Sequence, residues 1–389
     1  MNGRLDRLDG IATARYQRHE SIDWFSQQRL AQSRVAVIGA GAVGNEVVKN
    51  LVLLGTGAVD VFDFDQVEIH NLTRSIFLRE QDVGSNKADC VVRRAGEVDP
   101  NVSLRAFAGH FRDRLSLTML ARYDCVISAV DNFEARIQLS QMCRLTAVDL
   151  VNTAIDSRSI AVECFPFGSG DESACYECNL PESAYQRVAA RYSCGGLRRR
   201  AQVERRVPTT AITASVAGAL AVSTALRLGD SAESRARRIF VDSIGGAGSV
   251  TLLERRAGCP GCGACGSPPQ VIRTRNRWIS THLSGDIGPS TPQHLVRLSD
   301  ALITDYACRG CGPVPDAERY LRRRAADFDD SIAVCPQCGE NAIVIEVRDL
   351  FRLGELGEMF GRGAVPAKYA IVETGERSFC FDLEEDTDP

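Results

Sequence analysis

A short apolar run that leads directly into closely spaced glycines is the feature that most restricts the fold of this chain. Residues 35–38 read Val-Ala-Val-Ile, and the turn that follows contains Gly39, Gly41 and Gly44 before a stretch of helical composition. A buried strand, a tight glycine turn and a helix amino terminus bind phosphate well, because backbone N–H groups and the helix dipole point at the anion. The pattern predicts a βαβ unit and a bound nucleotide.

The same alternation of short apolar strands and helical stretches continues along the first part of the chain. It predicts strands at 58–63 and 125–130 and helices at 45–54 and 87–98. This alternation is typical of a doubly wound parallel sheet, in which ligands bind beyond the carboxyl ends of the strands. The expected fold class is therefore α/β, with a Rossmann-like domain as the larger part.

Length and composition indicate an ordinary globular protein. The 389 residues are 44% hydrophobic and 25% charged, with a formal net charge of −4, so nothing favours nucleic acid as the main partner. The apolar stretch 209–228 is interrupted by Thr and Ser, and we expect a buried helix there instead of a membrane span. Residues 1–20 lack the apolar segment of a secretory signal, so a cytoplasmic location is expected.

Composition divides the chain into three expected parts. Residues 1–30 read as a helical arm, 31–268 as the nucleotide-binding domain and 269–389 as a small C-terminal module. Within the second part, residues 166–207 break the alternation with Pro, Gly, cysteines and arginines, and we interpret them as a long crossing loop with a functional purpose. The arginines within 198–206 read most simply as a solvated loop, or alternatively as a docking patch for an acidic partner.

Fifteen cysteines in a chain of this kind indicate a reducing compartment and metal binding. Four CxxC pairs supply two sets of four thiolates, the ligand set of closed tetrahedral Zn²⁺ sites, so both zinc ions are expected to be structural. The predicted ligands are Cys175, Cys178, Cys259 and Cys262 in one site and Cys308, Cys311, Cys335 and Cys338 in the other. Cys265 is a spare thiol that can replace Cys259, and the simpler alternative is that these cysteines are reduced and carry no metal. Four more are expected in the core: Cys90, Cys125, Cys143 and Cys164.

Polar residues after the glycine turn extend the prediction from a nucleotide to a triphosphate. Asp63, at the end of the second predicted strand, is placed to bind ribose hydroxyls. Asn71, Arg74 and Lys87 add a donor and two cations beyond the ribose, which suits attack at an α-phosphate with pyrophosphate leaving. Asp131 follows another strand and is a candidate Mg²⁺ ligand. Without these residues, a nicotinamide- or flavin-dependent enzyme would be the leading interpretation.

Taken together, these motifs resemble the ThiF/MoeB/HesA family of the ubiquitin-activating enzyme superfamily. The matching stretches are Arg15-Tyr16-Gln17-Arg18, Ser33 through Gly44, Asp63-Phe64-Asp65, Asn71-Leu72-Thr73-Arg74, Lys87 and Val130-Asp131-Asn132. They lie in the family's order across roughly residues 15–265, and as a set they are far more specific than the glycine turn alone.

The resemblance implies an enzyme that uses ATP and Mg²⁺ to adenylate the C-terminal glycine of a ubiquitin-like or sulfur-carrier protein. The implied nucleotide-binding residues are Gly39, Gly41, Gly44, Asp63, Asp65, Asn71, Arg74 and Lys87, with Asp131 as the Mg²⁺ ligand. By the same resemblance, Arg18 reaches the nucleotide of the other subunit, which implies a homodimer.

Cys194 is the expected acceptor of the activated carrier as a thioester. It precedes two glycines in the crossing loop, where ThiF-like proteins carry their reactive cysteine, and nearby arginines favour a thiolate. The chain departs from its relatives here, because the spacing from the first cysteine pair is longer than in ThiF. Other activating enzymes place that cysteine just before a Pro-Thr-Thr sequence, where this chain has residues 205–207. The alternative is an inert loop thiol.

The expected function is activation of a ubiquitin-like protein, in a bacterial conjugation or antiphage pathway. One alternative is an adenylation-only enzyme for a sulfur carrier in thiamine or molybdopterin synthesis. A second is an NAD-dependent oxidoreductase, which would leave Lys87 and the cysteine pairs unexplained, and a third is a scaffold without activity. Residues 270–389 do not resemble a rhodanese domain, and we expect them to recruit the carrier or a conjugating enzyme.

Overall fold

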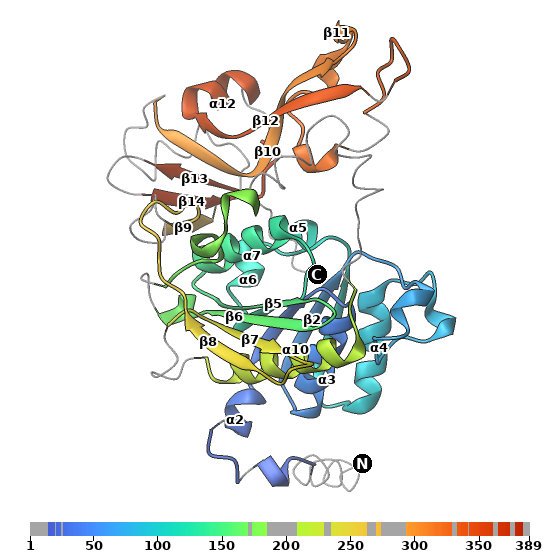
Figure 1. The fold of residues 1–389 in the computed structure, drawn as a ribbon. Coiled ribbons are helices and arrows are strands. Elements are labelled where there is room, and N and C mark those ends of the chain that lie inside the picture. The colour runs from blue at the N-terminus through green and yellow to red at the C-terminus, as the bar shows by residue number, and fades with distance from the viewer. Residues whose placement is uncertain are drawn as a thin grey trace, which may run out of the picture. The chain divides into compact units, whose positions relative to one another are not determined.

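The computed structural model describes residues 15–19, 21–24, 26–169, 173–184, 208–228, 235–262, 270–273, 293–328, 333–340, 342–360, 365–373 and 378–383 (Figure 1). By their contacts the residues form two compact units. The first comprises Met1–Asn179 and Val207–Ala264, and the second comprises Leu180–Arg206 and Cys265–Pro389. Each unit contains its own β-sheet.

The first unit is built on an eight-stranded sheet with the order β3-β2-β1-β4-β5-β6-β7-β8. Its parallel strands are β1 (Arg34–Ile38), β2 (Ala58–Asp63), β3 (Ser103–Ala108), β4 (Cys125–Ser128) and β5 (Asp149–Ile155). Its antiparallel strands are β6 (Ser159–Phe165), β7 (Arg237–Asp242) and β8 (Gly248–Leu252). The strand order reverses between β1 and β4, so the loops after these two strands meet at a topological switch point. This confirms the predicted α/β, Rossmann-like class.

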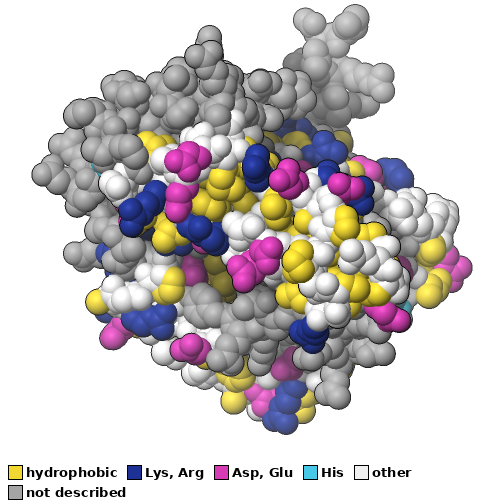
Figure 2. Space-filling view, turned by 90° about the horizontal axis from the view of Figure 1, so that it is seen from above, with side chains coloured by type: hydrophobic (Ala, Val, Ile, Leu, Met, Phe, Trp, Pro, Cys, Tyr) yellow, Lys and Arg dark blue, Asp and Glu magenta, His cyan; other side chains and the backbone are white. Residues whose placement is uncertain are grey.

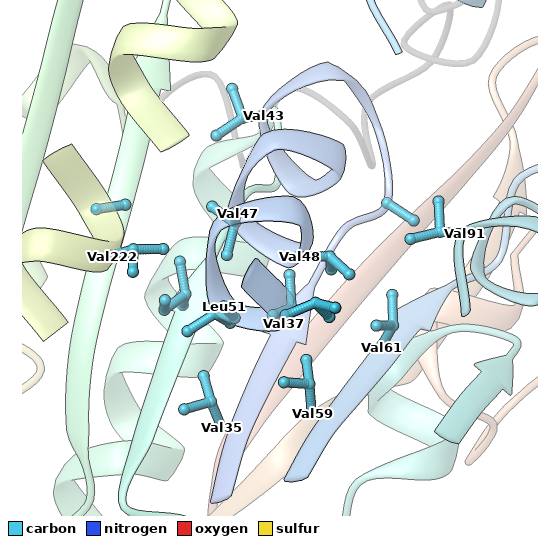
Figure 3. Close-up of a cluster of buried hydrophobic side chains, with 14 of the residues drawn as sticks. Val35, Val37, Val43, Val47, Val48, Leu51, Val59, Val61, Val91 and Val222 are labelled. Carbon is cyan, nitrogen blue, oxygen red and sulfur yellow. The ribbon is translucent and has the colours of Figure 1, made fainter. Parts of the chain in front are cut away.

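Helices cover both faces of this sheet. One face carries α3 (Ala42–Leu53), α4 (Lys87–Val98) and α10 (Ala211–Leu226), and the other carries α5 (Phe111–Arg114), α6 (Leu117–Leu120) and α7 (Phe133–Leu145) (Figure 1). Aliphatic side chains of α3 such as Val47 and Leu51 pack onto Val37 and Val61 of the central strands (Figure 3). Because these strands are buried on both faces, they read as continuous apolar runs in the sequence.

Helix α10 accounts for the apolar stretch near residue 210. Thr210 caps it, and small residues let it approach α3 closely, since a Cβ added at Gly218 would lie 2.5 Å from the Cβ of Glu46. Its buried residues, among them Ala214, Ala217 and Ala221, belong to the core of the first unit. This agrees with the prediction of a buried helix. Among the described residues, no helix is long and apolar enough to cross a membrane.

Short elements precede and connect the regular ones in the first unit. These are α2 (Gln27–Leu30) and the 3₁₀ turns η1 (Gln17–His19), η2 (Ile69–Asn71), η3 (Glu80–Asp82), η4 (Phe167–Ser169) and η5 (Tyr176–Asn179). Of the predicted helical arm, residues 1–14 lie outside the described residues. Tyr16 anchors the described part, because its hydroxyl bonds the Asp99 carboxylate and its ring occupies the space beside Gly55.

The second unit is a smaller sheet with one long hairpin. Its elements are β9 (Gln270–Arg273), β10 (Leu295–Cys308), β11 (Gly312–Pro313), η8 (Ala317–Arg319), η9 (Ala325–Asp327), β12 (Ile343–Arg352), α12 (Leu353–Phe360), β13 (Tyr369–Glu373) and β14 (Ser378–Asp382). Strand β10 pairs antiparallel with β12 along most of its length and with β13 at its start. One hydrophobic cluster packs around Phe351 and Phe381, and another packs around Tyr306 near the end of β10.

Charges of both signs are distributed over the surface. On the face shown in Figure 2, Lys and Arg side chains alternate with Asp and Glu side chains among hydrophobic ones. This distribution matches the formal net charge of −4 and gives that face no field of a single sign.

Candidate functional site

The loop between β1 and α3 has the backbone geometry of an anion site. Gly39 has a φ of +101° and donates its N–H to the carbonyl of Phe62 at 2.8 Å. A Cβ added at Gly39 would lie 2.7 Å from the carbonyl oxygen of Ala129, and one added at Gly44 would collide with the Gly39 carbonyl oxygen. Gly41, the N-cap of α3, makes no side-chain cap and has open space around its Cα. The first-turn N–H groups of α3 are therefore available to a phosphate.

Alanine substitutions at Gly41 and Gly44 are expected to separate folding from nucleotide binding. Gly44→Ala should lower the free energy of unfolding by about 2 kcal/mol, because a backbone carbonyl has to move. Gly41→Ala should leave stability unchanged, since nothing meets the new methyl, but weaken nucleotide affinity because that methyl occupies the open space. Thermal unfolding and calorimetric titration with ATP test both. Unchanged affinity in Gly41→Ala would show that no phosphate occupies this space.

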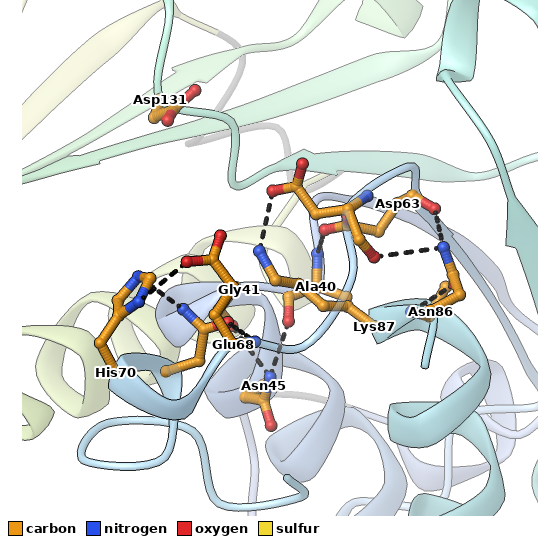
Figure 4. Close-up of polar contacts among 12 residues, drawn as sticks. Ala40, Gly41, Asn45, Asp63, Glu68, His70, Asn86, Lys87 and Asp131 are labelled. Carbon is orange, nitrogen blue, oxygen red and sulfur yellow. Dashed lines mark hydrogen bonds and ion pairs between the residues drawn. The ribbon is translucent and has the colours of Figure 1, made fainter. Parts of the chain in front are cut away.

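Asp63 closes the glycine loop from the end of β2 (Figure 4). Its Oδ2 accepts the N–H of Ala40 at 2.6 Å, and its Oδ1 accepts the N–H of Asp65 at 2.7 Å. Burial raises the pKa of the Asp63 carboxyl, and the two N–H donors oppose that rise. Asn86 donates its side-chain N–H to the Asp63 carbonyl at 2.9 Å. The carboxylate is thus fixed beside the loop, at the position expected of a ribose-binding acid.

Lys87 provides a cation at the same place. It is the first residue of α4, which Asn86 caps, and only 8% of its surface is exposed. Its Nζ lies 2.8 Å from Oδ2 of Asp65, and its backbone N–H donates to the Asp65 carbonyl at 2.9 Å. The Asp65 side chain is half exposed, so the pair is open to solvent. When a phosphate binds, the Lys87 ammonium can therefore pair with it in place of Asp65. The Asp65 carboxylate is then solvated and is not left buried without a partner.

Asn71 and Arg74 instead hold their own turn in this structure. Asn71 is buried; its Oδ1 accepts the N–H of Glu68 at 2.9 Å, and its Nδ2 lies 3.1 Å from Nε2 of His70. Arg74 donates Nη1 to the carbonyl of His70 at 2.9 Å. The turn around η2 therefore positions Arg74. The predicted site residues that contact one another beside the glycine loop are Asp63, Asp65 and Lys87. The predicted roles of Asn71 and Arg74 at the phosphates stay predictions.

Two asparagines of the site were not identified from the sequence. Asn45 is buried in α3. Its side-chain N–H groups donate to the carbonyls of Ala40 at 2.8 Å and Gly41 at 3.0 Å and so fix the glycine loop to the helix. Asn86 joins the end of β2 to the start of α4. A signal existed for both residues, since Asn86 directly precedes the predicted helix at 87–98 as a favoured N-cap, and Asn45 is a polar residue on an apolar helix.

Asp131 lies across the switch point from this group. It is exposed in the loop after β4, and Figure 4 draws it apart from the Asp63–Lys87 contacts. Asn132 donates to Asp131 Oδ1 at 3.3 Å and caps α7 through the N–H of Ala135. An exposed carboxylate oxygen at this position is a suitable ligand for Mg²⁺.

Arg18 is not brought to the glycine loop of its own chain. It is exposed in η1, two residues after Tyr16, whose ring packs at Gly55. Gly55 lies in the connection from α3 to the start of β2, whereas Asp63 is the last residue of that strand. Arg18 and Asp63 therefore belong to opposite ends of β2.

The first set of four cysteines forms a compact, buried centre in the first unit. Its four Sγ atoms lie within 4.8 Å of one another, with Sγ–Sγ distances of 3.6 Å for Cys175–Cys259 and 3.3 Å for Cys178–Cys262. Ligands at about 2.3 Å in a tetrahedron stand about 3.8 Å apart, so the four thiols fit a zinc ion. Hydrogen bonding among these thiols lowers the pKa of Cys178 and Cys259 and raises the pKa of Cys175.

The second set lies at the end of the β10–β12 hairpin. Its Sγ atoms also lie within 4.8 Å of one another, but Cys311 and Cys338 are exposed while Cys308 and Cys335 are buried. The N–H of Cys311 lies 3.4 Å from the sulfur of Cys308 and lowers the pKa of that thiol to about 7. The donor set again fits zinc, so both predicted cysteine clusters are present.

The other seven cysteines divide into a buried group, to which Cys380 of β14 also belongs, and two residues that the structure does not describe. Cys90, Cys125, Cys143 and Cys164 are buried, as predicted, and burial raises the pKa of Cys90, Cys125 and Cys143. Cys194, the expected thioester acceptor, and Cys265 lie outside the described residues, as do the arginines within 198–206.

Two relatives of known name match less than half of the chain. The sulfur carrier protein adenylyltransferase of Thermus thermophilus is 34% identical over 158 residues, covering 40% of this chain and 58% of its own length. The SAMP-activating enzyme E1 of Haloferax volcanii is 33% identical over 180 residues, covering 45% and 65%. The chain thus spans about three fifths of the length of these relatives.

Two solved structures share the fold. E. coli MccB, solved with MccA-N7isoASN, superposes with a TM-score of 0.51 at 22% identity and covers 64% of this chain and 74% of its own. PaaA superposes with a TM-score of 0.50 at 21% identity and covers 63% and 84%. The model of the ThiF family matches residues 15–261, which include the glycine loop, the Asp63–Lys87 group, Asp131 and most of the first cysteine cluster. The chain therefore belongs to the ThiF family.

Proposed function

We propose that this chain uses ATP to adenylate the C-terminal carboxylate of a ubiquitin-like or sulfur-carrier protein. The observation that carries the proposal is the buried Lys87, whose ammonium pairs with Asp65 beside a glycine loop that Asp63 closes. A dinucleotide site needs the loop and one acid but not this cation, whereas a triphosphate with a departing pyrophosphate needs positive charge there. Two relatives, an adenylyltransferase and an activating enzyme, support the same proposal by their names.

In the proposed reaction the carboxylate oxygen of the carrier attacks the α-phosphorus of ATP. The bond between that phosphorus and the oxygen bridging to the β-phosphate breaks, pyrophosphate leaves with the bonding pair, and an acyl-adenylate of the carrier remains. Negative charge grows on the phosphates, and the ammonium of Lys87 with the N–H groups of α3 stabilises it. Asp131 would hold Mg²⁺, which would supply further positive charge to the phosphates.

Ribose binding by Asp63 follows from its fixed carboxylate. Each oxygen accepts one backbone N–H, from Ala40 or Asp65, and each retains acceptor capacity for a ribose hydroxyl. Because the same N–H bonds tie the carboxylate to the glycine loop, ribose and phosphates are placed relative to one another by one rigid group.

Arg18 is proposed to serve the site of a second subunit. It lies at the opposite end of β2 from Asp63, so it has no role in the site of its own chain unless the arm moves. A homodimer in which each arm reaches the partner's nucleotide would add a guanidinium to the phosphates, as arginines supplied in trans do elsewhere.

Transfer to Cys194 and a role in a conjugation or antiphage pathway form the finer part of the proposal. They rest on the sequence around Cys194 and on the second unit. We propose that the second unit, with its cysteine cluster, is a module that recruits the carrier or a conjugating enzyme. Adenylation of a sulfur carrier without any thioester is the competing proposal, and the same experiment distinguishes the two.

The test uses pyrophosphate exchange into ATP, followed by intact mass measurement without reductant. The probes are a panel of small ubiquitin-like proteins with a C-terminal glycine, each matched with a copy lacking that glycine. We expect exchange with one intact carrier and none with its truncated copy. A carrier-sized adduct on the enzyme that thiol removes, and that Cys194→Ala lacks, would favour the thioester route. Exchange without an adduct would favour the sulfur-carrier route, and NAD⁺ binding without ATP binding would overturn the proposal.

A further inference from the structure

We propose that helix α7 couples the Cys175–Cys262 cluster to the loop that carries Asp131, so that metal binding in the cluster strengthens magnesium-dependent nucleotide binding. This inference rests on the proposed function only in assigning Mg²⁺ to Asp131. It assigns positioning roles to Arg136 and Gln141, two α7 side chains that the sequence motifs left without a role.

The carboxyl-terminal half of α7 is bound to the cysteine cluster. The turn η5 lies within the first CxxC pair, and its Tyr176 N–H donates to Oγ of Ser140 at 3.1 Å. Gln141 donates its side-chain N–H to Oε1 of Glu177 at 2.9 Å. A Cβ added at Gly261 would collide with that same Oε1, so Glu177 is wedged between the two cysteine pairs and α7.

The amino-terminal half of α7 holds the loop after β4. Arg136 donates Nε at 3.2 Å and Nη2 at 2.6 Å to the carbonyl of Val130, the residue before Asp131. Asn132 then caps the helix and contacts the Asp131 carboxylate. Arg136 of α7 therefore fixes the backbone just before Asp131, and Asn132, the N-cap of α7, fixes the Asp131 carboxylate.

The turn η5 also packs directly against α7, and its Tyr176 is only 5% exposed. If metal binding rearranges the cysteines and moves η5, it has to move α7 as well or break the hydrogen bonds of Ser140 and Gln141 to η5, because a packed helix shifts as one body.

Coupling of this kind is reciprocal and has a measurable signature. If the filled cysteine cluster tightens the Mg²⁺-dependent part of nucleotide binding by some factor, Mg²⁺ and nucleotide must tighten metal retention in the cluster by the same factor. Affinity for the nucleotide alone, set by the glycine loop, Asp63 and Lys87, should not change. A side chain that merely stabilised the fold would affect nucleotide affinity equally with and without Mg²⁺.

The experiment titrates the full chain, loaded with zinc, with a non-hydrolysable ATP analogue in buffer with and without Mg²⁺. For Arg136→Gln and for Gln141→Ala we expect the gain in affinity from Mg²⁺ to fall about tenfold while affinity without Mg²⁺ is retained. The gain in affinity from Mg²⁺ should be no smaller in the double variant than in either single variant, since both side chains act through the same helix. Gln138→Ala is the matched control, because Gln138 lies on the same helix and its amide oxygen has no partner among the described residues.

Zinc release to a chromogenic chelator provides a second readout that needs no activity. In the parent chain, Mg²⁺ with the analogue should slow release of one of the two zinc equivalents, and in Gln141→Ala it should slow neither. Arg136→Lys, which keeps a charged donor, should fall between parent and Arg136→Gln. Equal losses with and without Mg²⁺, additive losses in the double variant, or unaltered zinc release would overturn the coupling. A parent chain that binds no ATP analogue would overturn the proposed function instead.

Discussion

Lys87→Ala is expected to slow carrier adenylation by about 10³-fold while leaving the fold intact. The ammonium pairs with Asp65 and lies close enough to Asp63 to oppose the rise that burial causes in the pKa of that carboxyl, and its removal takes stabilising charge from the departing pyrophosphate. Stability should change by at most about 1 kcal/mol, because the Asp65 carboxylate that loses its partner is half exposed. Pyrophosphate exchange and thermal unfolding measure the two effects.

Lys49→Ala provides a matched control with the opposite pattern. Lys49 is one of only three lysines in the chain and also forms an ion pair, with Glu46 on the same helix. Because Glu46 is 6% exposed and packs against α10, losing Lys49 should lower the free energy of unfolding by about 2 kcal/mol. The exchange rate should stay close to that of the parent. If Lys87→Ala retained more than a tenth of the parent rate, its ammonium would not stabilise the transition state.

The central strands β1, β2 and β4 could be predicted from the sequence because they are almost fully buried, whereas the parallel strands β3, which is partly exposed, and β5 were not predicted. The predicted strands at 35–38 and 58–63 match β1 and β2 to within one residue, and the predicted helix at 87–98 matches α4. The strand expected at 125–130 ends at Ser128, because the chain turns there to present Asp131 at the switch point. Apolar runs and caps are local signals, and local signals were sufficient here.

The antiparallel half of the sheet was not predicted. All residues of β8 are exposed and β7 is mostly half-buried, so neither strand is a buried apolar run of the kind that β1 and β2 form. Their positions depend on pairing across long stretches of chain, as between Ser159 and Asp242. Such pairing leaves little trace in any single window of sequence.

At the site, the sequence identified residue types but not their contacts. Lys87 meets Asp65 because an isolated bridge between Gln66 and Asn86 brings the end of β2 to the start of α4. The roles of Asn45 and Asn86 depend on the same three-dimensional closure. The positions of Arg18 and Arg136 likewise follow from packing, of Tyr16 on Gly55 and of α7 on the cysteine turn, which spacing along the chain does not reveal.

Cys259→Ser is expected to have the largest effect on stability in the first unit. Cys259 is 1% exposed and joins the two cysteine pairs, so its loss should release one zinc equivalent. Because metal-binding free energy is folding free energy, a cost of about 4 kcal/mol or more is expected. At about 2–4 °C per kcal/mol for a unit of this size, the unfolding midpoint should fall by about 10 °C. Zinc content by elemental analysis and calorimetric unfolding provide the measurement.

Cys335→Ser and Cys143→Ala make this expectation specific. Cys335 is equally buried but belongs to the cluster of the second unit, so its loss should release the other zinc equivalent while nucleotide affinity is retained. Cys143 is a buried thiol outside both clusters, and its loss should release no zinc. If Cys259→Ser kept both zinc equivalents, or if Cys335→Ser abolished nucleotide binding, the two clusters would not be independent structural centres. If all three variants behaved alike, burial of a thiol and not metal binding would account for the loss of stability.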